Sequence, residues 1–264
     1  MDIEPDDALS ILVDVVFRKC RFINNNGAGV IVNAAKLDHD VDAPVSILFE
    51  DCDVSWSSDY RFESTSHGPQ AGCFVAPGYR ISGPKTAGSI TIRGGTVRGC
   101  AGAGLEIDEK PLGGPTVTFA DVTLNNTARA VDAGSFGLWS PRVPMPWVHT
   151  APIRIIDNVG GVGGVWFERV RVVDSVDRPF LRYYNGACPF ADRNTSRCPN
   201  AIRDLRGSIS VDWAASAAQC KPSLMSSGCI AGACLPHALP NGEIFGSKLL
   251  ENVSVRCAGQ PAYS

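Results

Sequence analysis

Charge is scarce in this chain, and neither sign prevails. Charged residues make up 19% of the 264 positions, with 24 Lys and Arg against 27 Asp and Glu. A protein that binds nucleic acid needs a basic face for the phosphates, so the composition argues against that partner.

Long apolar runs are also lacking. No stretch reaches the roughly 20 residues of a membrane-spanning helix, and Asp14 interrupts the run from residue 11 to 17.

A signal-peptide core is absent from the first residues, which read Met1-Asp2-Ile3-Glu4-Pro5 and are acidic.

Cysteine, in contrast, is abundant. Six of the ten cysteines crowd into the C-terminal quarter: Cys188, Cys198, Cys220, Cys229, Cys234 and Cys257. This crowding predicts a disulfide framework and an extracellular location. Zinc is the alternative, but His237 is the only histidine nearby and no C-x-x-C pair occurs.

Three N-x-S/T sequons, at Asn125, Asn194 and Asn252, agree with secretion and are candidate glycosylation sites. If the chain is secreted, a segment that directs its export is expected upstream of Met1.

An internal repeat is the strongest signal that the chain does contain. The pattern is apolar, any, apolar, two of any kind, small or apolar, any, apolar. Its full copies begin at Val15, Ile47, Ile90, Val117 and Val165, and a weaker copy begins at Leu250. Such spacing predicts a strand, a bend and a second strand rather than a helix. Repeated units of this kind bury a common core only when they stack.

A further strand is expected after each copy. The segments are Gly29–Val32, Gly72–Val75, Gly104–Ile107, Ala130–Ala133 and Pro179–Tyr183. We therefore predict an all-β fold, a right-handed parallel β-helix of about six to seven coils with long loops. Residues 1–213 would form the coils, and residues 214–264 a Cys-rich loop and the last coil. Because Asp2-Ile3-Glu4 aligns with Glu106-Ile107-Asp108, the chain is expected to open in the middle of a coil. Such an end would belong to a longer chain or dock a partner, including a second copy end to end.

Cys20 and Cys52 occupy the same position of successive repeats. Stacked coils would place their backbones about 4.8 Å apart. Buried free thiols are favoured over a disulfide, since cysteine is a good small core residue.

Two phrases resemble a known superfamily: Phe22-Ile-Asn-Asn-Asn-Gly-Ala-Gly-Val30 and Gly88-Ser-Ile-Thr-Ile-Arg-Gly-Gly-Thr-Val97. They are similar to the right-handed parallel β-helices of the pectin-lyase-like superfamily. That resemblance implies an extracellular protein acting on a polysaccharide that lies along an exposed sheet. The superfamily also contains adhesins and structural proteins. The paired aspartates and other signatures of polygalacturonases are absent, so no catalytic residue is carried over.

Outward positions of the predicted strands supply candidate catalytic residues. With Leu105 and Val131 pointing inward, Glu106 and Asp132 would lie side by side on adjacent coils, about 5 Å apart at the backbone. Retaining glycosidases use two carboxyl groups at about this separation. Crowding would also raise the pKa of one of them, as a general acid requires. Asp108 is a third candidate, and a solvated charged surface is the alternative.

Candidate substrate-binding residues lie in the loops around these strands: Trp139, Trp147, His67, Arg182 and Tyr184. Tryptophan faces stack on sugar rings, although both tryptophans would equally serve to seal a loop onto the solenoid. Arg182, with Lys85 and Lys110, would recognise carboxylates or support elimination chemistry. These cations are few and scattered, so the predicted acidic column favours a neutral glycan as the ligand.

Alternating carboxylates at Asp38, Asp40 and Asp42 suggest a calcium site, but the remaining ligands of an EF-hand are missing. A solvated turn is the alternative, and no other cofactor is expected.

Together these features predict a secreted carbohydrate-active protein, foremost a glycoside hydrolase using Glu106 and Asp132. A non-catalytic structural, adhesive or fibre-forming module is the second hypothesis. A polysaccharide lyase is the third, and it would need calcium or a basic cluster near Arg182.

Overall fold

The structure is a computed structural model. It describes residues 1–5, 10–25, 28–34, 37, 44–55, 77–82, 87–100, 102–108, 114–127, 151–157, 163–173, 179–185, 205–212, 223–230, 233–238 and 252–258. Only the backbone is described for residues 108, 156–157, 184–185, 223–230 and 233–238.

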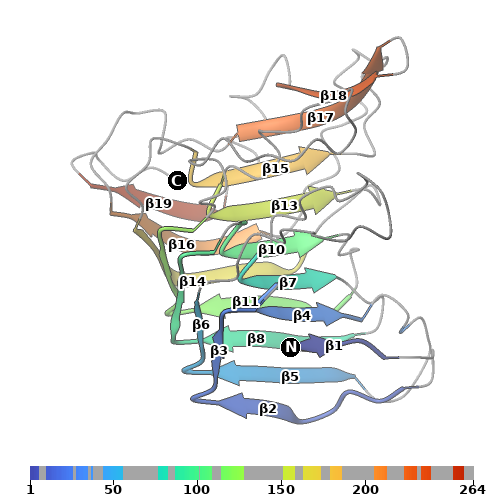
Figure 1. The fold of residues 1–264 in the computed structure, drawn as a ribbon, viewed down its shortest axis with the longest axis vertical. Helices are drawn as coiled ribbons and strands as arrows, with labels where there is room; N and C mark the ends of the chain where they lie inside the picture. The colour runs from blue at the N-terminus through green and yellow to red at the C-terminus, as the bar shows by residue number, and fades with distance from the viewer. Residues whose placement is uncertain are drawn as a thin grey trace.

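Every regular element in these residues is a β-strand, and the strands form two sheets. Sheet A runs in the order β1 (Asp2–Ile3), β4 (Val30–Asn33), β7 (Tyr79–Ser82), β10 (Leu105–Asp108), β13 (Ile153–Asp157), β15 (Leu181–Asn185), β17 (Ser223–Ile230) and β18 (Ala233–Ala238). All its neighbours pair in parallel except the antiparallel β17 and β18. Figure 1 shows these strands stacked along the long axis, from β1 in the lower part to β18 at the top.

Sheet B is parallel throughout and bends along its length. Before the bend lie β2 (Val15–Arg18), β5 (Val45–Glu50), β8 (Gly88–Arg93) and β11 (Thr116–Ala120). After it lie β3 (Arg21–Ile23), β6 (Asp53–Ser55), β9 (Thr96–Arg98) and β12 (Thr123–Asn125). The longer β14 (Val165–Val173) and β16 (Leu205–Val211) continue through the bend, and β19 (Val253–Cys257) pairs with β16.

The chain thus repeats one unit: a strand of sheet B, a bend, a short strand and a strand of sheet A. We call β2–β4 the first repeat, β5–β7 the second, β8–β10 the third, and so on along the chain. The all-β composition and the parallel sheets are consistent with a parallel β-solenoid, as the sequence predicts.

A single file of side chains runs through the interior. Register pairs join Phe17 to Phe49, Phe49 to Ile92, Ile92 to Phe119 and Phe119 to Phe167. The last four are at most 1% exposed. The rings of Phe17 and Phe49 stack with centroids 4.9 Å apart, and those of Phe119 and Phe167 with centroids 5.9 Å apart. This alignment, predicted from the repeat, is confirmed.

The bend in sheet B depends on a left-handed residue at one repeat position. Lys19, Asp51, Gly94, Asp121 and Arg169 hold it in five successive repeats, all with positive φ. In the first four, the amide N–H donates to a carbonyl of the next repeat at 2.8 Å. The turn therefore leaves these amides hydrogen-bonded, which offsets part of the cost of left-handed backbone.

Two of the predicted sheet A strands were assigned to the wrong residues. The neighbour of Val30 is Tyr79, so β7 stands in the stack where residues 72–75 were expected. The neighbour of Leu105 is Ile153, so β13 stands where residues 130–133 were expected. The prediction assumed that each sheet A strand follows its repeat copy at a nearly constant number of residues. Long insertions before β7 and β13 break that assumption, and they are tolerated because a longer loop adds little conformational entropy cost.

The sequence pattern also missed one copy, β16. In β16, Gly207 pairs with Phe167 and Ile209 pairs with Val170 of β14. Two residues of β16 therefore span the bend where β14 uses three, so the bend is one residue shorter. The predicted weak copy from Leu250 to Val255 overlaps β19, but its register was wrong: Val253 pairs with Gly207 at the repeat position of Phe167, and Val255 pairs with Ile209 at that of Val170.

The exposed large hydrophobic side chains of the described residues all belong to the segment that enters and forms the first repeat: Ile11, Val13, Val16 and Ile23. End-to-end association through this end stays a prediction. The described residues include no helix with the length and apolar character to cross a bilayer.

Candidate functional site

The outward face of sheet A carries a column of charged residues. The register aligns Arg80 with Glu106, Glu106 with Arg154, and Arg154 with Arg182. Each has buried apolar neighbours before and after it in its strand, so its side chain leaves the opposite face of the sheet. We call these four residues the arginine column. Their strands β7, β10, β13 and β15 follow one another in Figure 1.

Glu106 is the one carboxylate of the arginine column, and two arginines flank it. Its Oε1 lies 3.4 Å from Nε of Arg80, and its Oε2 lies 3.4 Å from Nη1 of Arg154. Glu106 is 3% exposed and Arg154 8% exposed. A buried carboxylate held between two guanidinium groups is a structural ion triad, because both of its oxygens are engaged.

Arg182 ends the arginine column without such a partner. Its Nε and Nη1 are buried and have no hydrogen-bond partner among the residues that the structure describes. Burial away from water lowers the pKa of Arg182 to about 10. A buried donor without an acceptor is costly, and a buried charge more so. Among these four residues, two guanidinium groups share the one carboxylate, and Arg182 keeps two donors without an acceptor.

This register overturns the predicted side-by-side placement of Glu106 and Asp132. Both sheet neighbours of Glu106 are arginines, Arg80 in β7 and Arg154 in β13. Asp132 lies outside the described residues, so the structure brings no second carboxylate to Glu106 from a neighbouring strand. The reason is the insertion before β13, which moves the next strand of sheet A to residues 153–157.

The second outward position of sheet A holds Asp108 and Tyr184. Asp108 aligns with Ser82 and Ile156, and Tyr184 aligns with Ile156 and Met225. Only their backbones are described. Asp108 is thus two residues along the strand from Glu106, and its register neighbours carry no carboxylate.

The other loop candidates lie outside the described residues: Trp139, Trp147, His67, Asp38, Asp40, Asp42, Asn194, Cys188, Cys198 and Cys220. Their predicted roles therefore stay predictions. Within the described ranges, no group of three His, Cys, Asp or Glu side chains is arranged to hold a metal ion.

Three predicted disulfide residues fall within described strands. Cys257 is 2% exposed and disulfide-bonded, and its partner lies outside the described side chains. Cys229 and Cys234 face each other in the antiparallel register of β17 and β18, where only the backbone is described. Cys20 and Cys52 are free thiols, which confirms that prediction.

Of the candidate glycosylation sites, Asn252 is exposed in the turn before β19. Asn125 ends β12 and is half-buried, and Thr127 of its sequon is 1% exposed. Asn252 is therefore the more accessible of these two positions.

Arg80 and Arg154 are the residues that reasoning from the sequence missed. Both sit in short segments with apolar residues on either side, Tyr79-Arg80-Ile81 and Ile153-Arg154-Ile155. The same alternation marks Leu105-Glu106-Ile107 and Leu181-Arg182-Tyr183, so a search for apolar-charged-apolar triplets would have found all four. Comparisons with protein-family models, with curated proteins and with solved structures gave no match to this chain.

Proposed function

We propose that this chain is an extracellular carbohydrate-binding protein that holds an acidic polysaccharide on the outer face of sheet A. The observation that carries the proposal is the guanidinium of Arg182, whose buried Nε and Nη1 have no acceptor among the described residues and which lies beside Arg154 in register. Nε–H and the N–H groups of Nη1 point in different directions, so a uronate carboxylate would accept a hydrogen bond from one of these nitrogens and a second oxygen of the glycan from the other.

Charge decides between an acidic and a neutral glycan. The predicted column held Glu106 and Asp132 and favoured a neutral ligand. The observed arginine column holds three guanidinium groups and one carboxylate, and that carboxylate is already shared by Arg80 and Arg154. An anionic ligand would supply the acceptor that Arg182 lacks, whereas a neutral sugar would leave its charge uncompensated.

The regular stack suits a polymer. In the proposed fold, a right-handed parallel β-helix of about six to seven coils, outward side chains recur at about 4.8 Å from strand to strand. A chain of sugars lying across the strands would meet several of these side chains in turn. The buried disulfide-bonded Cys257 and the cysteine-rich C-terminal region support the proposed extracellular location.

Binding is tested by calorimetric titration of the purified protein with oligosaccharides of matched length, uronic acid oligomers against neutral glucose oligomers. We expect binding of the uronate series alone. Arg182→Gln should weaken it by about 10-fold to 100-fold, through the loss of a charge-assisted hydrogen bond.

Arg256→Gln is the matched control, because it removes the same charge from an exposed position on β19 in sheet B. It should leave affinity unchanged. Equal loss in both variants would mean that net charge alone attracts the polymer, and tight binding of neutral oligomers would reject the proposal.

A second candidate function is β-elimination of the bound uronate chain, favoured by the pKa of Arg182 near 10. In that reaction a base removes the proton α to the uronate carboxyl group, a C=C bond forms, and the glycosidic C–O bond breaks. A neutral guanidine is a competent base, and burial makes that form easier to reach than in water. Neighbouring guanidinium groups would stabilise the developing enolate charge.

Elimination creates an unsaturated uronate that absorbs ultraviolet light, so its formation can be followed directly. Activity that rises with pH toward about 10 and disappears in Arg182→Lys, while binding persists, would support the lyase. Binding without any ultraviolet-absorbing product would leave the protein a binding module.

A further inference from the structure

Cys20 and Cys52 are free thiols at the same bend of the first and second repeats. Both follow the left-handed residue of their repeat, Lys19 or Asp51. The residues after them pair in parallel register, Arg21 with Asp53, and the amide of Asp53 donates to the carbonyl of Cys20 at 2.9 Å. Directly adjacent strands place their Cα atoms within the range that a disulfide can bridge.

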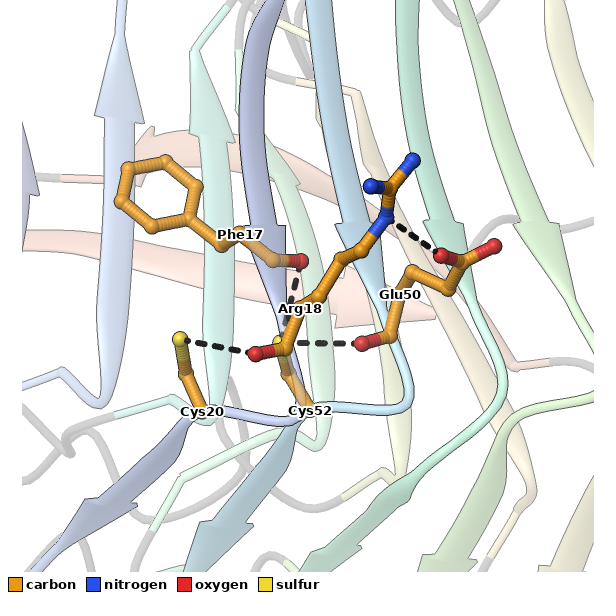
Figure 2. Close-up of polar contacts among 5 residues, drawn as sticks. All are labelled: Phe17, Arg18, Cys20, Glu50 and Cys52. Carbon is orange, nitrogen blue, oxygen red and sulfur yellow. Dashed lines mark hydrogen bonds and ion pairs between the residues drawn. The ribbon is translucent and has the colours of Figure 1, made fainter.

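The Cys20 sulfur lies beside the first repeat, and the Cys52 sulfur lies between the two repeats, since it is also 3.4 Å from the carbonyl oxygen of Glu50 in its own repeat. Cys20 Sγ is 3.5 Å from the carbonyl oxygen of Arg18, and Cys52 Sγ is 3.4 Å from that of Phe17. Cys52 thus reaches from its own strand across to the neighbouring one. Figure 2 shows the two side chains projecting to the same side of the bend, each beside main-chain carbonyls.

Accessibility differs between the two residues. Cys20 is half-buried, whereas Cys52 is 2% exposed, and burial raises the pKa of the Cys52 thiol. A reagent therefore meets Cys20 first, and Cys52 is placed to react second.

We propose that Cys20 and Cys52 are a redox modification site that closes to a disulfide and fastens the first repeat to the second. The oxidant is a small-molecule disulfide. The Cys20 thiolate attacks one of its sulfurs, forming a mixed disulfide and releasing one thiolate. The Cys52 thiolate then attacks Cys20 Sγ and releases the second. Two electrons pass from the cysteines to the reagent, and their two protons leave with the two small thiols.

The bond would act at strands with few neighbours among the described residues. Val16 in β2 and Ile23 in β3 are exposed, and each of these strands pairs with one described strand, β5 or β6. Local opening of such strands costs less than global unfolding. A covalent link at the bend would couple opening of β2 and β3 to that of β5 and β6. This inference does not depend on the proposed glycan function.

Cleavage after glutamate followed by mass spectrometry tests the site on the folded wild-type chain. Cys20 is the only cysteine of residues 5–50, and Cys52 the only one of residues 51–63. The protein is incubated with oxidised glutathione, and remaining thiols are alkylated before digestion. We expect the two peptides to be joined in most molecules, and separated by a reducing agent.

Cys100→Ser removes the other described free thiol and should leave the joined peptides unchanged. Cys20→Ser should abolish them and, after oxidation, should show faster amide hydrogen exchange in residues 15–23 than the oxidised wild type. Alkylated Cys20 and Cys52 in the folded, oxidised wild type would overturn the proposal. So would either cysteine joined chiefly to a different peptide.

Discussion

Arg169 donates two hydrogen bonds to Asp121 across neighbouring repeats, with Nε 2.6 Å from Oδ1 and Nη2 2.7 Å from Oδ2. Both residues hold the left-handed position at the bend of sheet B. The hydrogen bonds from Arg169 lower the pKa of Asp121 below its ordinary value. The pair therefore joins two bends whose backbone conformation is otherwise unfavourable for residues other than glycine.

The ion pair of Asp121 and Arg169 should make the free energy of unfolding depend on pH. Because the pKa of Asp121 is lower in the folded than in the unfolded chain, its contribution is present above the unfolded pKa, near 4. It is lost as pH falls through the folded value. Chemical denaturation from pH 7 to pH 2 should show a steeper acid loss for the wild type than for Asp121→Asn. The side chains are exposed, so the difference should be small and should shrink in high salt. Identical acid profiles would contradict the role of the pair.

Glu106 should prove important for stability. Glu106→Ala would leave Arg80 and Arg154 facing each other without their shared carboxylate, at a cost of about 3–5 kcal/mol in the free energy of unfolding. Urea denaturation measures the loss. Glu50→Ala is the matched control, since it breaks the exposed ion pair with Arg18 and should cost less than about 1 kcal/mol. Comparable losses in the two variants would show that Glu106 is not held in a buried triad.

Arg182 should behave in the opposite way. Arg182→Met removes two unpaired buried donors and a buried charge while keeping a side chain of similar length. We expect the ligand-free protein to gain about 1–3 kcal/mol of stability and to lose uronate binding. A residue that lowers stability and raises affinity is typical of a binding site. Destabilisation by this substitution would instead assign Arg182 a structural role.

Gly207 should not tolerate a side chain. Its φ is +119°, and a Cβ would fall 1.6 Å from the carbonyl oxygen of Phe167 in the neighbouring strand. Gly207→Ala should cost roughly 2–4 kcal/mol, through the clash and the strained backbone. Gly104→Ala is the control, because its nearest contacts begin at 3.0 Å with a flexible Leu124 methyl group. Thermal unfolding of both variants decides the matter, and an unchanged midpoint for Gly207→Ala would contradict this packing.

The interior of the fold could be predicted from the sequence because its rule is local. Within each copy, apolar residues separated by one position place Phe17, Phe49, Ile92 and Phe119 in one file, whatever length of loop lies between copies. A change of one residue within the copy breaks that rule, which is why the shorter bend at Gly207 concealed β16.

The site could be predicted only in part because it depends on register between distant strands. Glu106 and Arg182 were placed correctly on the outward face, since the strands containing them follow their repeats at the expected distance. Arg80 and Arg154 were missed because long insertions precede β7 and β13. Because residues 130–133 were predicted where β13 lies, Asp132 was expected beside Glu106 in place of Arg154. The sequence therefore predicted a neutral ligand, whereas the arginine column favours an acidic one.

The most direct measurement of the central claim is a crystal structure of the protein soaked with a uronic acid oligosaccharide. The account predicts a uronate carboxylate within hydrogen-bonding distance of Nε or Nη1 of Arg182, with the sugar chain crossing the strands of sheet A toward Arg154. A protein carboxylate bound to those two nitrogens, or an oligosaccharide bound away from sheet A, would contradict it.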